Sequence, residues 1–373
     1  MTYLDHNATT PLKPQAAARM AHMAGLWGNA SSVHRYGREV RQHMMAARHT
    51  LSGAVGATPA GIVFCSGATE ALHLALAQCA PTQVAYTAIE HDAVRAAAGT
   101  QATVIPATPD GVVHLIALEK ILQQGSIKLV ACMLANNETG VLQPVADVAA
   151  LAKKYGAMVV VDAVQAVGKI PFHFGSLGVD MAAISAHKMG GPAGMGALLV
   201  REGLDIRPIL RGGGQEMNRR AGTENFLGIM GFAAAAETLE ADLAFQQNLS
   251  AWKNAFEEKI VAHAPHATIA GRRAPRLPNT TCVIMKNTPS ETQVVTMDLE
   301  GIAISAGAAC SSGRVKPSHV LQAMGFDAAD AASAIRISSG RTTTEADYVQ
   351  AWQVWLSLYQ RKHSTPSTTP LAA

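Results

Sequence analysis

Short apolar runs alternate with helical patterns through the middle of the chain. The strand-like runs are IVFCSG (62–67), KLVACMLANN (128–137), AMVVVDAVQ (157–165), MAAISAHK (181–188) and GALLVR (196–201). Between them, ATEALHLALAQ (68–78) has helical spacing, and PVADVAALAKKYG (144–156) opens with proline and closes with glycine, as helices often do. Strands that are apolar throughout and joined by helices belong to parallel sheets covered on both faces. The pattern therefore predicts an α/β fold with a mostly parallel sheet.

Polar side chains stand where several of these strands end. They fall in four segments: 66–69, 136–138, 162–165 and 185–188. Sheets of this kind bind ligands outside the carboxyl ends of their strands. We therefore expect these segments, which supply a lysine, an acid, amides and hydroxyls, to face one crevice.

Lys188 and Asp162 indicate what the crevice binds. A lone lysine is usually a solvated surface residue, but Lys188 directly follows small and apolar residues, where an ammonium group is costly. Asp162 ends a fully apolar strand earlier in the chain. A lysine can form a Schiff base with pyridoxal phosphate, and a carboxylate can keep its pyridine nitrogen protonated. The segment SGATEA (66–71) opens a helix and offers backbone N–H groups to the phosphate.

Composition and charge narrow the class of protein. The 373 residues are 49% hydrophobic and 15% charged, which is typical of a globular protein rather than a disordered one. The net charge is +3 and the basic residues are scattered, so we expect no nucleic-acid or anionic-membrane partner. The chain has no apolar run of membrane-spanning length and begins MTYLDHNATTPL, without the layout of a signal peptide. These features predict a cytoplasmic protein.

One of the five cysteines lies in an unusual setting. Cys65, Cys79, Cys132 and Cys282 fall in apolar or helical runs, where a cysteine acts as a small hydrophobe. Because the spacing offers no CxxC pair, we expect neither a zinc knuckle nor an all-cysteine iron–sulfur site within the chain. Cys310 instead stands in GIAISAGAACSSGRVKPSHV (301–320), among small residues and just before basic ones. This setting is typical of a reactive thiol on a loop.

Ten ordered motifs make the chain similar to a known family. They are YLDHNATTPL, GNASSVHRYG, FCSGATEA, EHDAV, NNETG, VDAVQAVGK, SAHKMGGPAGMGAL, GGGQEMNRRAGTEN, SAGAACSSGRVKPSHVLQAMG and AIRISSGRTTTEAD. From residue 3 to about residue 350, the chain resembles the NifS-like cysteine desulfurases, in the long-loop branch that includes NifS and IscS. The resemblance implies the type I, aspartate aminotransferase-like fold of the class V aminotransferase group, with pyridoxal 5′-phosphate as cofactor.

The resemblance also implies roles for individual residues. Lys188 matches the Schiff-base lysine, Cys310 the sulfur-accepting cysteine and Arg336 the arginine that binds the substrate carboxylate. The remaining cofactor-binding positions are Ala68, Thr69, His91, Asn137, Asp162, Gln165, Ser185, His187 and Thr223.

Four of these positions have a more specific role in the family. His91 stacks on the cofactor ring and relays protons, Gln165 bonds the phenolic oxygen, and Asn137 also contacts the substrate. Thr223 reaches the phosphate from the other subunit, so a homodimer is expected. Ordinary structural roles stay open at three positions: a strand-end histidine for His91, a helix cap for Thr69 and a partner of a core carboxylate for Arg336.

In the activity that the resemblance implies, L-cysteine is converted to L-alanine and its sulfur is left on Cys310 as a persulfide. The sulfur then passes to iron–sulfur cluster assembly or another acceptor, with Cys310 available as a transient Fe–S ligand shared with a scaffold protein. The alternatives are a selenocysteine lyase, another class V aminotransferase or lyase, and a non-catalytic protein that binds pyridoxal phosphate. A loop cysteine favours the desulfurase, because an aminotransferase has no use for it.

The chain is expected to form two domains. Residues 14–245 are predicted to form a large cofactor-binding α/β domain, and residues 1–13 with 246–360 a smaller α+β domain that carries Cys310. The Ser/Thr/Pro-rich end, 361–373, is predicted to be disordered. The chain departs from the family pattern at Cys65, Asp92, Ala193 and 217–218, and none of these changes removes a reacting group.

Overall fold

The apolar runs of the sequence form a seven-stranded sheet. In the computed structural model, which describes residues 1–307 and 317–363, the strand order is β2 (Ile62–Cys65), β8 (Gly196–Val200), β7 (Met181–Ser185), β6 (Met158–Asp162), β5 (Leu129–Met133), β3 (Val84–Thr87) and β4 (Thr103–Ile105). Strands β7, β6, β5, β3 and β4 are parallel, whereas β8 is antiparallel to both of its neighbours. The predicted α/β class with a mostly parallel sheet is confirmed.

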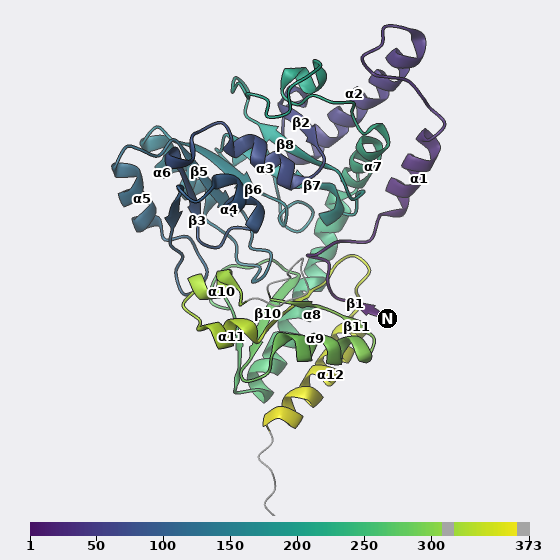
Figure 1. The fold of residues 1–373 in the computed structure, drawn as a ribbon. Helices are drawn as coiled ribbons and strands as arrows, with labels where there is room; N and C mark the ends of the chain where they lie inside the picture. Colours follow the sequence, from purple (N-terminus) through teal and green to yellow (C-terminus); the bar gives the residue numbers. More distant parts are fainter. Residues whose placement is uncertain (308–316, 364–373) are drawn as a thin grey trace, which may run out of the picture.

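Helices cover both faces of this sheet (Figure 1). They are α1 (Pro14–Met23), α2 (Arg35–Val55), α3 (Ala68–Leu76), α4 (Asp92–Ala98), α5 (Leu115–Gln123), α6 (Val145–Lys154) and α7 (Phe226–Ala236). Successive residues of β6 enter different cores: Val160 belongs to a cluster with Leu72 of α3 and Val94 of α4, and Val161 to a cluster with Val148 of α6. Because alternate side chains of a strand point to opposite faces, β6 is apolar on both sides.

A second, smaller sheet lies apart from the first. It is antiparallel, in the order β12 (Ser305–Ala306), β13 (Ala334–Ser338), β10 (Thr280–Met285) and β9 (Ala267–Ile269). Helices α8 (Leu239–His263), α9 (Ser290–Leu299), α10 (His319–Ala323), α11 (Ala328–Ala332) and α12 (Glu345–His363) surround it (Figure 1). Among the residues described, no helix is long and apolar enough to cross a membrane.

The start of the chain joins the two parts. β1 (Thr2–Tyr3) pairs in parallel with β11 (Ile302–Ala303), and Leu4 is buried in the same core as Trp355 of α12. Beyond Leu4, the backbone bonds first to Ser338 of β13 and then, through Thr10, to the carbonyl of His187 after β7. Residues 5–10 therefore pass between the two sheets. Residue 245 lies inside the continuous helix α8, and the predicted division into domains stays a prediction.

Short 3-10 helices connect the longer elements. They are η1 (Pro59–Gly61), η2 (Pro81–Gln83), η3 (Phe174–Ser176), η4 (Ala186–Lys188) and η5 (Gln215–Asn218). The departure at residues 217–218 falls in η5, where Glu216, Met217 and Asn218 have φ values of 47°, 55° and 64°. Non-glycine residues seldom adopt this region. The turn is held by the buried carboxylate of Glu216, which accepts bonds from Arg48 at 2.6 Å and from the Phe64 N–H at 2.8 Å.

Candidate active site

A cavity of about 640 Å³ opens at the carboxyl ends of the central strands, between the two parts of the molecule. Most of the predicted site residues line it: Ala68, Thr69, His91, Asn137, Asp162, Gln165, Ser185, His187, Lys188 and Arg336. These residues come from strand ends and helix starts far apart in the sequence. The structure thus brings together the segments that the strand-end pattern places at one crevice.

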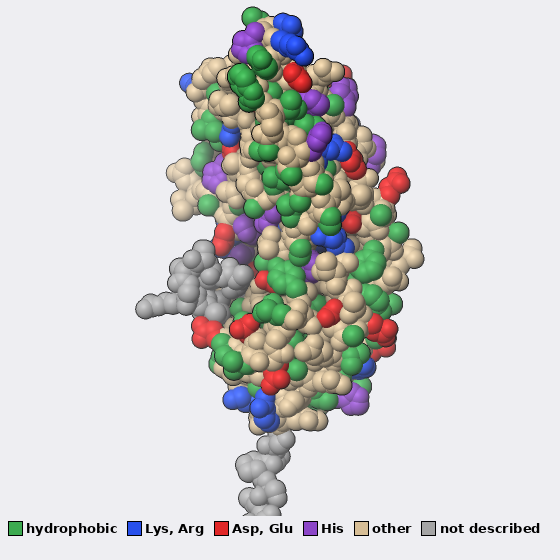
Figure 2. Space-filling model, turned by 90° about the vertical axis from the view of Figure 1, so that its right-hand side faces the viewer, with side chains coloured by type: hydrophobic (Ala, Val, Ile, Leu, Met, Phe, Trp, Pro, Cys, Tyr) green, Lys and Arg blue, Asp and Glu red, His purple; other side chains and the backbone are tan. Residues whose placement is uncertain are grey.

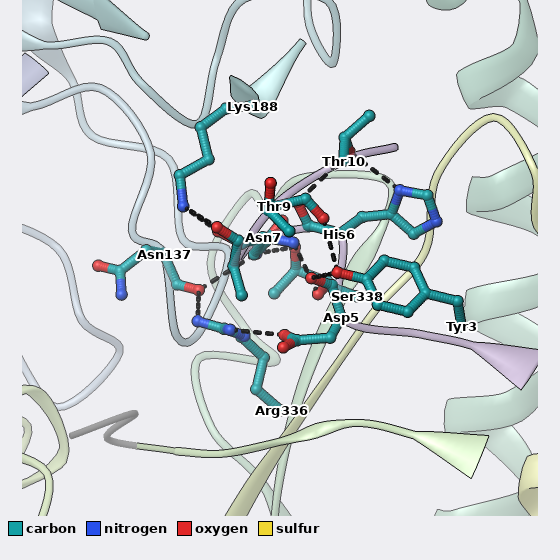
Figure 3. Close-up of polar contacts among 12 residues, drawn as sticks. Tyr3, Asp5, His6, Asn7, Thr9, Thr10, Asn137, Lys188, Arg336 and Ser338 are labelled. Carbon is teal, nitrogen blue, oxygen red and sulfur yellow. Dashed lines mark hydrogen bonds and ion pairs between the residues drawn. The ribbon is translucent and has the colours of Figure 1, made fainter. Parts of the chain in front are cut away.

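Lys188 lies half-buried in the wall of this cavity, directly after β7. Its Nζ donates hydrogen bonds to the backbone carbonyls of Asn7 and Ala8, each at 2.6 Å (Figure 3). Burial, followed by the charge of Arg336, lowers the pKa of Lys188 from 10.5 to about 8, against the opposing effect of Asp5 and Asp162. With this pKa, roughly a tenth of the amine is neutral, and therefore nucleophilic, at pH 7, against a far smaller fraction for an ordinary lysine.

Asp162 ends β6, opposite Ala183 of β7 in the sheet. Its side chain is buried, and Oδ1 accepts the backbone N–H of Val164 at 3.0 Å. Burial raises the pKa of this carboxyl, while the Val164 bond and then the charges of His91 and Lys188 oppose the rise. A cationic nitrogen bound in the cavity would further stabilise the charged form of the buried Asp162 carboxylate.

The start of α3 forms another part of the cavity wall. Gly67 is the N-cap, and Ala68 and Thr69 begin the helix, so their N–H groups lack partners within it. β8 approaches this turn closely, because a Cβ at Gly196 would lie 2.6 Å from the carbonyl carbon of Gly67. The result is a helix N-terminus that favours an anionic group.

Ser185 and His187 lie beside the start of α3 in the wall of the same cavity. Ser185 is the last residue of β7, and His187 belongs to η4. The Nδ1 of His187 lies 3.1 Å from the Thr9 hydroxyl. Burial, then the charge of Lys188, lowers the pKa of His187 to about 4. His187 is therefore neutral at physiological pH and can serve as a hydrogen-bonding group beside an anion.

His91 caps a helix and also lines the cavity. It is the N-cap of α4, where its Nδ1 accepts the N–H of Ala93 at 3.1 Å, and its side chain lines the cavity. Because Nδ1 acts as an acceptor, the neutral ring carries its proton on Nε2. The cap thus fixes the tautomer that His91 presents.

Arg336 lies on the opposite wall, in the middle of β13. Its Nη2 pairs with Asp5 Oδ1 at 2.8 Å, and its Nη1 donates to the carbonyl of Asn137 at 3.1 Å (Figure 3). The third donor, Nε, is buried and has no partner among the described residues. Arg336 therefore pairs with a carboxylate of the protein, as the structural alternative allowed, and also lines the cavity.

Two predicted residues are not among those that line this cavity. Thr223 lines a separate cavity of about 180 Å³, which shares Ser66, Gly194 and Met195 with the first. Cys310 lies outside the described residues. The described chain resumes at Pro317, and both Pro317 and His319 line the main cavity.

The cavity wall also contains residues beyond those predicted to bind the cofactor or the substrate. Asn7 and Ala8 of the YLDHNATTPL motif line the cavity. Glu138, beside Asn137, is buried there and accepts a bond from the Ser318 hydroxyl at 2.5 Å, and burial raises its pKa to about 7. Glu138 belongs to the strand-end segment 136–138, which the sequence predicts to face the crevice. For Asn7 the only signal was the motif itself.

Metal binding has no support within residues 1–307 and 317–363. No group of three or more His, Cys, Asp or Glu side chains there is arranged to hold an ion. Cys65, Cys79, Cys132 and Cys282 are free thiols, and burial raises the pKa of each. These four thiols are therefore poor nucleophiles, which leaves Cys310 as the candidate.

Comparison with known proteins shows the family of the chain. The family model of aminotransferase class-V matches residues 2–350. An IscS-like cysteine desulfurase of Mycobacterium tuberculosis is 36% identical over 95% of both chains, and a cysteine desulfurase of Cereibacter sphaeroides is 40% identical over 92% of both. The solved structure of a NifS-like protein from Rickettsia africae superposes with a TM-score of 0.89 at 33% identity, covering 96% of this chain and 99% of that one. The chain belongs to the class-V aminotransferase family, in its group of NifS-like cysteine desulfurases.

Proposed function

We propose that the chain is a pyridoxal-phosphate-dependent enzyme that converts L-cysteine to L-alanine and leaves the sulfur on Cys310 as a persulfide. The observation that carries the proposal is the arrangement of Lys188, Asp162 and Arg336. An amine with a lowered pKa and a buried carboxyl face one cavity, and an arginine lines its opposite wall. Few functions other than chemistry on an amino acid require these three groups together.

The residues around the cavity fit pyridoxal phosphate. The volume of about 640 Å³ is that of a small-molecule site. Lys188 would hold the aldehyde covalently, and Asp162 would face the ring nitrogen. The N–H groups at the start of α3, with Thr69, Ser185 and His187, would hold the phosphate. When bound, the cofactor withdraws electrons from the α-carbon of the amino acid.

The substrate would be held and activated by residues on both walls. Arg336 matches the planar geometry of a carboxylate, and Asn137 lies beside it. The neutral amine of Lys188, with a pKa of about 8, can accept the α-proton of the substrate. His91, with its proton on Nε2, is placed to donate toward the cavity.

The sulfur transfer needs one further group, which we assign to Cys310. The Cys310 thiolate attacks the substrate sulfur, a new S–S bond forms, and the C–S bond breaks with its electron pair left on the substrate carbon. Protonation of that carbon yields alanine, so one cysteine and one thiol give alanine and a persulfide without an external oxidant. Pro317 and His319 support this assignment, because both line the cavity and both follow Cys310 closely in the sequence.

We also propose that the unit is a homodimer and that Cys310 passes its sulfur to an acceptor protein in the cytoplasm, such as an iron–sulfur scaffold. Thr223 lies outside the main cavity of its own chain, as a residue that serves a partner's site would. Charges of both signs are scattered over the face drawn in Figure 2, which favours a protein acceptor over nucleic acid. Sedimentation of the holoprotein as a monomer, or persulfide transfer to no scaffold protein, would count against these proposals.

The decisive experiment replaces the thiol. The Cys310→Ser variant should keep the visible absorption of bound cofactor but release no alanine from cysteine, because a hydroxyl cannot accept sulfur as a persulfide. Turnover of cysteine sulfinate, whose sulfur leaves as sulfite, should survive. Cys79→Ser is the matched control, since this partly buried thiol is remote from the residues that line the cavity. Alanine production at the wild-type rate by Cys310→Ser would refute the assignment.

A further inference from the structure

A buried lysine stands directly behind the cavity, bonded to amide oxygens. Lys169 is 6% exposed, and its Nζ donates to Asn7 Oδ1 at 2.7 Å and to Gln165 Oε1. Burial, and then repulsion from Lys188 and Arg336, lowers the pKa of Lys169 well below its usual value. Among the described residues Lys169 has no carboxylate within ion-pair distance, and burying a lysine in that way is costly unless its donors are satisfied.

Lys169 contacts the oxygen end of two amide groups, those of Asn7 and Gln165. The two side-chain atoms that Lys169 Nζ contacts are Asn7 Oδ1 and Gln165 Oε1, and amide oxygens can only accept hydrogen bonds, so the lysine is the donor in both. Gln165 Nε2 is then the end that donates to the Asn7 carbonyl, at 3.0 Å. Asn7 Nδ2 is the end that donates to the carbonyl of Asn137, at 3.1 Å, and to Thr280 Oγ1, at 2.9 Å.

Hydrogen bonds connect the amides of Asn7 and Gln165 to Lys188 and Arg336 through shared backbone carbonyls. The Asn7 carbonyl that accepts from Gln165 also accepts from Lys188 Nζ at 2.6 Å. The Asn137 carbonyl that accepts from Asn7 also accepts from Arg336 Nη1 at 3.1 Å. Figure 3 shows Asn7 between Lys188 and Arg336. Lys169 thus contacts the two amide groups whose hydrogen bonds connect Lys188 on one wall of the cavity with Arg336 on the other.

We propose that Lys169 is a positioning residue that acts by binding the side-chain oxygens of Gln165 and Asn7. With its oxygen held in this way, the Gln165 side chain directs one N–H to the Asn7 carbonyl and the other to a ligand in the cavity. Gln165 lines the cavity. Lys169 is not among the described residues that line it. The inference rests on the proposed function, in which that second N–H would reach the phenolic oxygen of pyridoxal phosphate.

The test measures the pH midpoint of the visible absorption band of the holoprotein. An N–H that bonds the phenolic oxygen favours the deprotonated chromophore, whose oxygen is the more negative. In Lys169→Met the Gln165 amide is free to rotate, so the midpoint should rise, by up to about one pH unit for the loss of one hydrogen bond. Lys253→Met is the matched control, because Lys253 is also buried but bonds the Leu277 carbonyl, away from the cavity.

A double-variant cycle separates positioning from charge. If Lys169 acts through Gln165, then Gln165→Met should raise the midpoint alone, and adding Lys169→Met should change it no further. Shifts that add would show that Lys169 acts through its own charge, and would overturn the inference, as would an unchanged midpoint in a folded Lys169→Met protein. If Lys169→Met does not fold, Lys169→Gln takes its place, because the shorter amide cannot reach both oxygens. A wild-type holoprotein without any visible band would instead refute the proposed cofactor.

Discussion

The two walls of the cavity are built in different ways. On one wall, Asp162 and Lys188 stand at the carboxyl ends of the neighbouring parallel strands β6 and β7. On the other, Arg336 pairs with Asp5, and these two residues are 331 positions apart in the chain. The first wall follows from the alternation of strands and helices, whereas the second exists only once the start of the chain has crossed between the two sheets.

The second wall nevertheless controls the chemistry of the first. After burial, the charge of Arg336 is the main cause that lowers the pKa of Lys188 to about 8, and Asp5 opposes it. The Asn7 and Ala8 carbonyls hold the same amine. The large sheet therefore positions Lys188, whereas Arg336 and the segment that contains Asp5 set its pKa. Variants on the two walls should accordingly have different effects on the reaction.

The largest effect is expected on the first wall. Lys188→Ala should lower the rate of alanine formation from cysteine by about 1,000-fold or more, because it removes both the covalent anchor and the proton acceptor. The measurement is steady-state alanine release, with circular dichroism to confirm folding. Lys154→Ala, at an exposed lysine paired with Glu119, should leave the rate unchanged. A rate within tenfold of wild type in Lys188→Ala would contradict the roles given to this residue.

An intermediate effect is expected on the second wall. Arg336→Lys should raise the KM for cysteine by about 10- to 100-fold, because an ammonium group cannot make the paired bonds of a guanidinium with a carboxylate. The effect on kcat should be smaller. Arg276→Lys, at a buried arginine paired with Glu257 in the smaller part, should alter stability but not KM. If kcat fell while KM stayed constant, Arg336 would act in the chemical step, as Lys188 does, rather than in binding the substrate.

The smallest effect is expected from the coupling between the walls. In apoprotein, the rate of covalent capture of pyridoxal phosphate should rise with pH through about 8, because only the neutral amine of Lys188 reacts. Asp5 raises the pKa of Lys188, so Asp5→Asn should move this midpoint to lower pH, by a fraction of a unit. Stopped-flow absorbance at a series of pH values would measure both midpoints. A shift to higher pH in Asp5→Asn would show that the two walls are not coupled through charge.

Local signals predicted the first wall well. In β6 and β7, valine, isoleucine and alanine residues are followed directly by Asp162 and Ser185, and a helix with clear boundaries precedes β6. A buried strand that ends in an ionisable residue can be recognised without knowledge of its neighbours, because the cost of burial must be offset by function or by a partner. The crevice followed because parallel strands end at a common edge.

Glu138 and Lys169 show where such signals are insufficient. Both lie in motifs of the family resemblance, NNETG and VDAVQAVGK, but neither motif indicates which group the side chain contacts. The bond from Ser318 to Glu138 and the bond from Lys169 to Asn7 join segments that are distant in sequence. A side chain's role in a hydrogen-bond network depends on which acceptor reaches it, and that is decided by the packing of elements.

By itself, the sequence determined the class of fold, the family and the strand ends that supply Asp162 and Lys188, and it singled out Cys310 as a candidate reactive thiol, which stays a prediction. Only the tertiary structure decided that Asn7 and Ala8 line the cavity, that Asp5 pairs with Arg336, and that Lys169 bonds the oxygen of Gln165. The physical reason is the range of the interactions. Periodicity and strand ends are written into neighbouring residues, whereas the pKa of Lys188 and the direction of an amide depend on charges and donors that only folding brings within a few ångströms.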